Sequence, residues 1–596
     1  MITSPSMRTV RWLCLVATLC LLAFGWIYAV ERTTTFDSAF YVWLLLDGNG
    51  PVAFHDRIGA WLPQLPALPL IGMGSPLIVV LRTYSICLLL LPLLVLGVLA
   101  GPMRDSAHAL GLLLLLLVGL RSTFYFGISE VNLGIAWCAM VGALLHRSLS
   151  TSAPWGWWSA AVLCAVWSTL HHPVLILATM ASAGCVAVAN KAGRRLIVPL
   201  IAMAGSIGLR MVLMGGTPYE MGRMPTLPLI SDHIGHLGEL ASTGHLLSSI
   251  GTFVLFFLLI IITTIGLLLT RQWTLLLWTL VINVGSGVLI LIADRNVGTD
   301  FMYENFYPVL AWCWTLPAAR VLLRALERAP RATTFLLTAF MVMGLAQVHQ
   351  ARSTAVDKVR YAERLTGALR QQGIRKAVLN ARCLPWGTVH ADWTLPMETA
   401  LVSALQGADK AVTCYATYAP DTLGGSATRT GAFLGPSWQP GWFDARYLNK
   451  RYLDLPDGAY RLVNQRGPWH PERTLGAAEV TIIVPEGILS FGPEDHTAVS
   501  VRLLNRTGVM LQSLDAEGEP LRLRAVVLSP KQAPMVVDPD PGPMELDIPP
   551  WSHTPQSVLV PRPDRSGIHW VTVDLMQGGR TTGISAGFWM RSWPHR

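Results

Sequence analysis

The sequence predicts an α-helical polytopic membrane domain, followed by a small α/β unit and an all-β sandwich. Hydrophobic residues make up 52% of the chain, charged residues make up 14%, and the mean hydropathy is +0.45. These values lie far from the averages of soluble proteins. Long stretches such as 112–119 and 253–269 carry no charge, whereas the composition from residue 357 onward is that of a soluble protein. The chain therefore divides near residue 350.

About eleven segments match the length of a membrane-spanning helix, for which about 20 apolar residues are needed. They are 12–30, 77–100, 107–126, 131–146, 157–170, 173–190, 195–214, 249–270, 273–293, 305–323 and 333–348. Arg8 and Arg11 precede the first segment, as in a signal peptide, but no small-residue cleavage site separates it from Glu31. We predict that the first segment is a retained anchor and that residues 1–350 form one transmembrane domain.

The charges of the loops predict which side each loop faces. With the amino terminus inside, the inner loops hold twelve basic residues and two acidic ones, whereas the outer loops hold four basic residues and eleven acidic ones. This asymmetry follows the positive-inside rule. We predict a multi-pass protein of the inner (plasma) membrane with a cytoplasmic N-terminus. Because the number of spans is odd, the soluble part is expected to be periplasmic, on the same side as the outer loops.

The soluble part contains two patterns. Residues 351–465 predict a small α/β domain, with helices over 359–372 and 398–405 and strands over 377–380 and 411–415. Residues 475–596 contain short segments of alternating hydrophobicity separated by Pro/Gly turns, which is typical of an immunoglobulin-like β-sandwich. The predicted strands of the sandwich are 480–484, 498–505, 521–528, 556–560 and 569–575.

Composition also narrows the classes of partner and cofactor. The net charge is +9, but the basic residues are scattered and do not form a nucleic-acid-binding block. Cys383 and Cys414 are the only cysteines of the soluble part. They either pair, as an extracytoplasmic compartment would allow, or remain two buried thiols. We expect no cofactor. His233 and His236 have a spacing compatible with a metal but lack a third ligand, so a solvated loop face is favoured and a divalent cation is unsupported.

The first outer loop, residues 31–76, holds the first candidate site. The loop is long, aromatic and amphipathic, so we expect it to lie along the membrane surface. Asp37 follows the first span directly, and a carboxylate there can act as a general base on an acceptor hydroxyl. The alternative is that Asp37 is the N-cap of a helix that begins at Ser38. His55 and Asp56, in the sequence Phe54-His-Asp-Arg57, are further candidates for substrate binding and for the base.

Three arginines lie inside apolar segments, near the predicted outer ends of their spans. Charges at such depth are costly and usually face a polar cavity or an anionic partner. A guanidinium group binds phosphate bidentately and stays charged. Alternatively, the side chains extend to the lipid headgroups. These arginines are Arg82, Arg121 and Arg210, and together with Arg295 they could hold the phosphate of a lipid-linked substrate.

Further polar residues lie at the junctions of spans on the outer side. Glu130, His171 and His172 can point into a cavity beneath the first outer loop. Glu304 lies in an aromatic and charged segment that leads into the tenth span. Such a segment is suited either to stacking on a sugar or to anchoring at the membrane interface. We include Glu130, His172 and Glu304 among the candidate substrate-binding residues.

The sequence Phe36-Asp37-Ser-Ala-Phe-Tyr41 after the first span, with a long amphipathic loop and about ten further spans, resembles the GT-C class of polyprenyl-phosphate-sugar-dependent glycosyltransferases. The resemblance covers about residues 1–350. It implies that an outer-loop carboxylate is the catalytic base, with Asp37 as first candidate and Asp56 as second. Ser38 follows Asp37 where the protein-mannosyltransferase branch has an adjacent Asp-Glu pair.

The tail is similar to immunoglobulin-like modules attached to bacterial polysaccharide-assembly enzymes. The likeness rests on Val501–Gly508, on Ile548-Pro-Pro-Trp551 and on Gly567–Met576. It implies a role in binding glycans, independently of the membrane spans.

These observations predict a hexosyl- or pentosyl-transferase at the outer face of the membrane. Its partners would be membrane lipid, a polyprenyl-phosphate-linked sugar donor, and a glycan, lipid or protein acceptor. A transporter or flippase is one alternative, but it predicts paired repeats with broken helices, and the sequence has no internal repeat. The other alternative is a cell-envelope scaffold with a glycan-binding tail, which would leave the arginines of the spans without a role.

Overall fold

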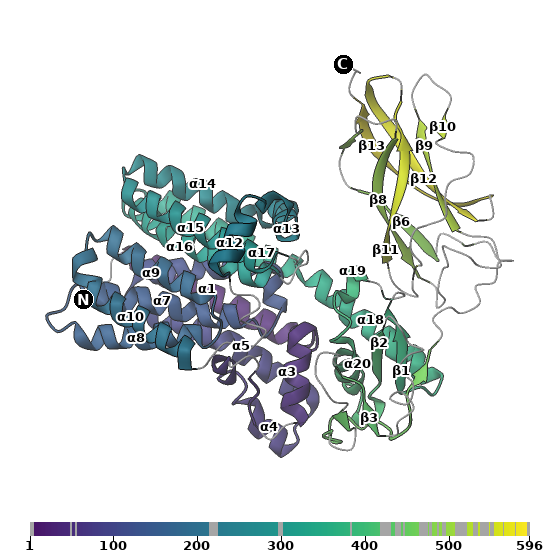
Figure 1. Ribbon diagram of the computed structural model, residues 1–596, viewed down its shortest axis with the longest axis horizontal. Helices are drawn as coiled ribbons and strands as arrows, with labels where there is room; N and C mark the ends of the chain where they lie inside the picture. Colours follow the sequence, from purple (N-terminus) through teal and green to yellow (C-terminus); the bar gives the residue numbers. More distant parts are fainter. Residues whose placement is uncertain are drawn as a thin grey trace. The chain divides into compact units, whose positions relative to one another are not determined.

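The computed structural model divides the chain into two compact units, residues 1–356 and 357–596 (Figure 1). Each unit is described here by itself. The structure describes residues 5–47, 50–53, 57–213, 225–295, 302–381, 384, 386–417, 431–435, 443–444, 448–463, 475, 479–485, 488–491, 496–506, 521–528, 534–536, 548, 553–563, 565–577 and 580–592.

The first unit is built from helices throughout its described residues. Its main helices are α1 (Pro5–Ile27), α2 (Ala29–Thr33), α3 (Phe36–Asp47), α4 (Ala67–Met73), α5 (Leu77–Ala100), α6 (Ser106–Val118), α7 (Glu130–Ser148), α8 (Trp155–Thr169), α9 (Leu175–Ala189), α10 (Gly193–Leu213), α12 (Leu227–Ile234), α13 (Ala241–Ser249), α14 (Val254–Leu269), α15 (Trp273–Ala293), α16 (Met302–Arg328) and α17 (Pro330–Gln350). Short 3-10 turns lie between them, of which η1 (Ile58–Trp61), η2 (Arg121–Tyr125) and η4 (Ile250–Phe253) matter below.

Among the described residues, seven helices are long and apolar enough to cross a membrane. They are Met7–Ile27, Leu77–Ala100, Gly193–Val212, Ala241–Leu269, Trp273–Ala293, Phe306–Arg328 and Pro330–Gln371. Each of the other four predicted spans also contains a helix: α6, α7, α8 or α9. The span predicted over 107–126 is too long, because α6 ends at Val118 and a separate 3-10 turn follows. The prediction of a mostly helical structure with several long apolar helices is confirmed, while the membrane location and the count of eleven spans stay predictions.

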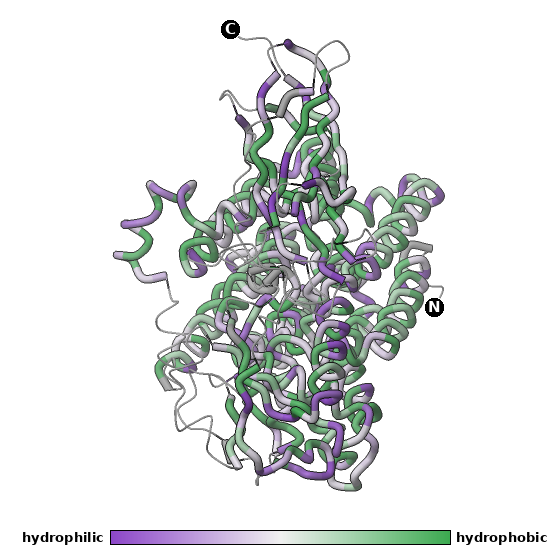
Figure 2. The backbone as a smooth tube through the Cα atoms, turned by 90° about the vertical axis from the view of Figure 1, so that its right-hand side faces the viewer, coloured by the Kyte–Doolittle hydropathy of each residue, from purple (hydrophilic) through white to green (hydrophobic). Residues whose placement is uncertain are grey.

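The surface of this unit is apolar where a soluble protein would be polar. Leu19, Ile201 and Leu277 are 59%, 68% and 64% exposed, and they lie on α1, α10 and α15. Contiguous apolar surface of this kind indicates contact with lipid or protein. By contrast, α6 is buried on all sides from His108 to Val118, as expected for an apolar helix without a polar face. Figure 2 shows hydrophobic residues along most of the length of these helices.

Long-range contacts identify the two ends of the helical bundle. At one end, Arg11 on α1 donates hydrogen bonds to the carbonyls of Ala100 and Gly101, 2.7 and 3.2 Å away, at the end of α5. At the other end, the amide of Gly59 in η1 donates to the carbonyl of Leu170, which follows α8. We call them the Arg104 end, after a residue of the α5–α6 loop, and the α3 end.

The second unit begins with α18 (Arg352–Gln371), which crosses the boundary, and contains a small parallel sheet. The sheet order is β2 (Thr413–Thr417), β1 (Lys376–Asn380) and β5 (Arg461–Leu462). Helices α19 (Trp386–Val389) and α20 (Leu395–Ala404) complete the described part, with a short pair of strands, β3 (Ala432–Phe433) and β4 (Phe443–Asp444). The strands and the second helix predicted for this segment are present within three residues of their predicted ends, whereas the first helix, α18, begins seven residues before its predicted start.

The last segment of the chain is all-β, as predicted. One sheet has the order β10 (Met535–Val536), β9 (Leu521–Leu528), β12 (Gly567–Gln577), β13 (Arg580–Ser592) and β7 (Ile488–Ser490). The other has the order β11 (His553–Pro561), β8 (His496–Asn505) and β6 (Val480–Ile483). Alternate residues of both sheets, such as Val499, Val571 and Phe588, form one hydrophobic core. Strand β13 was not predicted, and the immunoglobulin-like type stays a prediction.

Candidate functional site at the α3 end

Arg32 fixes the backbone of the first loop just after α1. Its side chain is buried, and its Nε donates a 2.9 Å hydrogen bond to the carbonyl of Phe124, while an NH group donates to Ser85, 3.2 Å away. Burial lowers the pKa of Arg32 to about 9, so the guanidinium remains charged at neutral pH. A methyl group on Gly127 would lie 2.1 Å from the carbonyl oxygen of Arg32. These contacts therefore hold the loop against the helical bundle at this point.

Glu130 is the centre of a buried polar cluster. It is the first residue of α7 and is 4% exposed. The hydroxyl of Tyr41, from α3, donates a 2.9 Å hydrogen bond to Oε1, and the guanidinium of Arg57, just before η1, lies 3.3 Å from Oε2. The positive end of the helix dipole also stabilises a carboxylate at this position. Three segments that are far apart in the sequence therefore meet at one carboxylate.

Asp37 belongs to the same cluster. It is the second residue of α3, half-buried, so it lies in the first turn of the helix rather than at the N-cap. Burial raises the pKa of Tyr41 well above its usual range, the negative charges of Glu130 and then of Asp37 raise that pKa further, and Arg57 lowers it. Residues four apart on a helix lie on the same face, so Asp37 lies on the face of α3 that carries Tyr41. The predicted base and a predicted binding residue thus share one site.

His171 supports the segment that carries Arg57. Its ring is buried, and its Nδ1 lies 3.0 Å from the carbonyl of Trp167. A methyl group on Gly59 would lie 2.3 Å from the same Nδ1, so η1 packs directly against the imidazole. Burial lowers the pKa of His171 to about 4, which keeps the ring neutral at physiological pH. His172, by contrast, accepts a 3.1 Å hydrogen bond from the amide of Val174 and shapes the α8–α9 turn.

The four arginines predicted to bind phosphate have four different neighbours. Arg82 lies over the ring of Trp26 at 5.0 Å, and Arg121 lies over Phe253 at 5.8 Å. Arg210 donates to the sulfur of Met211, and Arg295 donates to the carbonyl of Ile292. These contacts do not bring the four guanidinium groups together. The guanidinium of Arg57, in contrast, lies 3.3 Å from Oε2 of Glu130.

Some predicted residues fall where the structure gives no description. His55 and Asp56 lie outside the described residues, and so does the side chain of Glu304, whose backbone is in α16. Cys383 is also outside them, so its pairing with Cys414 stays a prediction. The thiol of Cys414 is buried in β2.

Sequence reasoning missed Tyr41 and Arg57 as members of the site. Tyr41 could have been found, because residues four apart on a helix share a face and Asp37 is four residues earlier. The contact between Arg57 and Glu130 joins residues 73 positions apart and has no local signal. Within the described part of the α3 end, no three histidine, cysteine or acidic side chains are close enough to share a metal ion.

Comparisons with protein-family models, with curated proteins and with solved structures gave no match for this chain.

Proposed function

We propose that this protein is an integral membrane glycosyltransferase that moves a sugar from a polyprenyl-phosphate donor to an acceptor at the outer face of the membrane. One observation carries the proposal: the Tyr41 hydroxyl and the Arg57 guanidinium meet at the buried Glu130 carboxylate, and Asp37 lies one turn before Tyr41 on the same helix. A base and a fixed cation at the end of a helical bundle are the groups that this reaction requires.

The two carboxylates have different environments, and this difference assigns their roles. Glu130 is buried, and its oxygens are occupied by the Tyr41 hydroxyl and the Arg57 guanidinium. Glu130 is therefore suited to act as a positioning residue. Asp37 is half-buried in the first turn of α3 and can reach a substrate. We assign the general base to Asp37, which removes the proton of the acceptor hydroxyl.

The reaction then proceeds as a single inverting displacement. The acceptor oxygen attacks the anomeric carbon, the bond between that carbon and the phosphate oxygen breaks, and the lipid phosphate leaves with the bonding electrons. The proton of the acceptor ends on Asp37. Arg57 is suited to stabilise the departing phosphate, because its guanidinium is held near the carboxylates by Glu130. A strong general acid is unnecessary, since phosphate is already a stable anion.

The location of the site at one end of the apolar helices favours a lipid-linked donor. A polyprenyl chain can remain among the exposed apolar side chains of helices such as α1 while its phosphate reaches the polar cluster. The charges of the loops favour placing this end on the outer side, together with the soluble unit.

A second function, glycan binding by the tail, is favoured by a row of exposed apolar residues on one sheet. Across four strands, Leu528 pairs with Trp570, Trp570 with Trp589, and Trp589 with Ile488. Trp589 is 47% exposed, and the two indole rings lie 4.8 Å apart. The ion pair between Arg524 and Asp574 lies on the same outward face. Aromatic surface next to polar groups suits a sugar ring, so we favour a glycan as the acceptor.

The test is transfer by the purified full-length protein from radiolabelled polyprenyl-phosphate hexoses and pentoses. The Asp37→Asn variant should fold normally and lose transfer by a factor of about 10³ or more, as expected when a general base is removed. The matched control is Asp47→Asn, because Asp47 is half-buried at the other end of the same helix. A transporter or scaffold would release no labelled product, and full activity of Asp37→Asn would overturn the assignment of the base.

A further inference from the structure

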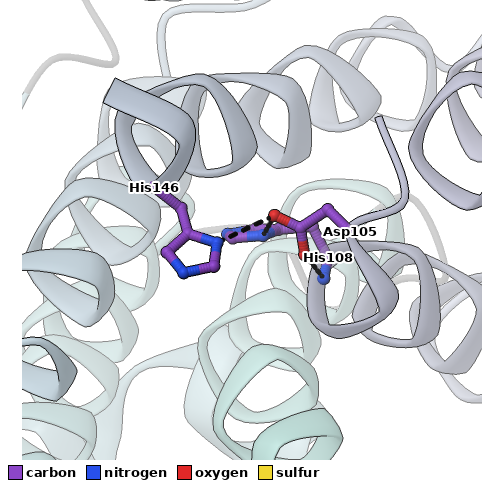
Figure 3. Close-up of side chains that lie close together, drawn as sticks. All are labelled: Asp105, His108 and His146. Atoms are coloured by element: carbon purple, nitrogen blue, oxygen red, sulfur yellow. Dashed lines mark hydrogen bonds and ion pairs between the residues drawn. The ribbon is translucent and has the colours of Figure 1, made fainter. Parts of the chain in front are cut away.

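Three polar side chains form a second cluster, at the Arg104 end of the bundle (Figure 3). Asp105 is the N-cap of α6 and accepts a hydrogen bond from the amide of His108. One oxygen of its carboxylate, Oδ2, lies 2.8 Å from Nδ1 of His108 and 3.1 Å from Nδ1 of His146. The two imidazoles hold the pKa of Asp105 well below its usual range despite its burial. The carboxylate is therefore charged and fixes both rings.

The cluster forms part of the wall of two cavities that share His146 and Ser150. One has a volume of about 200 Å³ and is lined by Arg104, Asp105 and Arg147. The other has a volume of about 390 Å³ and is lined by Asn190, Lys191 and Arg195. The loops that follow α5 and α9, the end of α7 and the start of α10 therefore place four basic side chains, an imidazole and a hydroxyl around these two adjoining cavities.

Two of the basic residues have an unusual backbone conformation. Arg104 and Lys191 have φ angles of +52° and +51°. This left-handed conformation after a helix normally selects glycine or asparagine, because other side chains make it unfavourable. The chain nevertheless has a long basic side chain at both positions, and both side chains line a cavity.

A cation does not fit this cluster well, although its three ligand atoms lie within 4.8 Å of one another. If Nδ1 of His108 bound a metal, its Nε2 would carry the proton, and a metal-bound histidine normally donates that proton to an acceptor. His108 is fully buried, and its Nε2 has no hydrogen-bond partner among the described residues. The arginines around the cavity would repel a cation in addition.

We propose that the two cavities bind a phosphate group, either in the headgroup of an anionic lipid or as a free phosphate. Arg147 and Lys191, with Arg104 and Arg195, supply the positive charge. Asp105 accepts a hydrogen bond from Nδ1 of His146 and so fixes the ring, and Figure 3 shows the second ring nitrogen of His146 on the side away from Asp105. Basic pockets between membrane helices are suited to phosphate headgroups. This site lies at the opposite end of the bundle from the proposed transferase site.

The experiment measures binding to the full-length protein in detergent. Inorganic phosphate is followed by equilibrium dialysis, and phosphatidylglycerol and phosphatidylcholine are compared by native mass spectrometry. The wild type should bind phosphate and should prefer phosphatidylglycerol. The double variant Arg147→Gln/Lys191→Gln should bind these ligands about 30-fold more weakly, because it loses two positive charges near the phosphate. If inorganic phosphate and phosphatidylglycerol compete with each other, the phosphate group alone is recognised. If only phosphatidylglycerol binds, the lipid is the source of the phosphate group, and if only inorganic phosphate binds, the free ion is the source.

The matched control is Arg271→Gln. Arg271 is exposed, has a φ angle of +53° and follows α14, but it lines neither cavity. Its loss should change binding by less than about twofold. Equal losses in the control and in the double variant would mean that only general surface charge matters. The proposal is also overturned if neither phosphate nor phosphatidylglycerol binds, or if Zn²⁺ binds in a manner that Asp105→Asn abolishes while phosphate does not.

Discussion

The hydroxyl of Tyr41 donates a 2.9 Å hydrogen bond to Oε1 of Glu130, which joins the first loop to the first turn of α7. Both side chains are buried, so the bond is shielded from competition by water. Asp37 lies one helical turn before Tyr41 on α3. The position of the proposed base therefore depends on an anchor that lies one turn away in the same helix.

Removing the Tyr41 hydroxyl should destabilise the protein and reduce transfer. In Tyr41→Phe, Glu130 loses a hydrogen-bond donor while it remains buried, which costs about 1–3 kcal/mol. Thermal unfolding in detergent measures the loss. Tyr84→Phe is the matched control, because the hydroxyl of Tyr84 is buried without a hydrogen-bond partner among the described residues. We expect Tyr84→Phe to be neutral or slightly stabilising, and an equal loss in both variants would contradict the role of the Tyr41–Glu130 bond.

Adding one methyl group to Gly59 should displace η1 and with it Arg57. The new Cβ would lie 2.3 Å from Nδ1 of the buried His171 ring, which has no room to move. We expect Gly59→Ala to lose about 1–3 kcal/mol of stability, and to lose transfer as well. Gly72→Ala is the control, because Gly72 lies in α4 and has no atom within 4 Å of the new methyl group. Its melting temperature should be unchanged or slightly raised.

Stability should fall between about pH 6.5 and pH 4 because of His171. Burial lowers its pKa to about 4, whereas an unfolded histidine has a pKa of about 6.5. Within this window the unfolded chain binds a proton that the folded chain does not bind, so the free energy of unfolding decreases by about 3 kcal/mol as the pH falls. His171→Phe should remove most of this slope. His236→Gln, a change to an exposed side chain, should keep it.

Local patterns were sufficient to predict most of the helices, the division near residue 350 and five strands of the tail, although not β13. They were sufficient because helix periodicity and apolar length are properties of neighbouring residues. The contacts of the site depend instead on which faces of separate helices meet. Arg82, Arg121 and Arg210 were predicted near the outer ends of their spans, yet Arg121 lies in η2, and the three side chains lie against Trp26, Phe253 and Met211. The depth of a residue along a span can be predicted from one segment, whereas the direction of its side chain depends on how the helices pack against one another.

The buried ion pair of the second unit should be essential for its stability. Nζ of Lys358 on α18 lies 2.8 Å from Oε1 of Glu398 on α20, and both side chains are almost fully buried. Glu398→Gln leaves a buried ammonium group without its counter-charge, which costs about 3–5 kcal/mol. Differential scanning calorimetry would follow the transition of this unit. The control is Asp409→Asn, which breaks the largely exposed 2.8 Å ion pair with Lys410. This variant should leave the temperature of the transition unchanged.

The exposed tryptophan of the tail provides a test of glycan binding that does not depend on catalysis. Trp589 lies on β13 beside Trp570, whose indole packs over Gly587, since a methyl group on Gly587 would lie 2.2 Å from that ring. The platform is therefore fixed before any ligand arrives, and little entropy is lost on binding. Trp589→Ala should weaken binding of the full-length protein to maltohexaose, cellohexaose or xylohexaose by about tenfold, as measured by calorimetry.

Leu559→Ala is the matched control for this prediction. Leu559 is 55% exposed but lies on β11, in the other sheet, so its loss should not affect binding. Binding that survives in Trp589→Ala, or an absence of binding to all three oligosaccharides, would contradict a sugar platform on this sheet. If Trp589→Ala binds weakly yet transfers sugar to a small soluble acceptor at the normal rate, the tail selects the acceptor and the α3 end performs the chemistry.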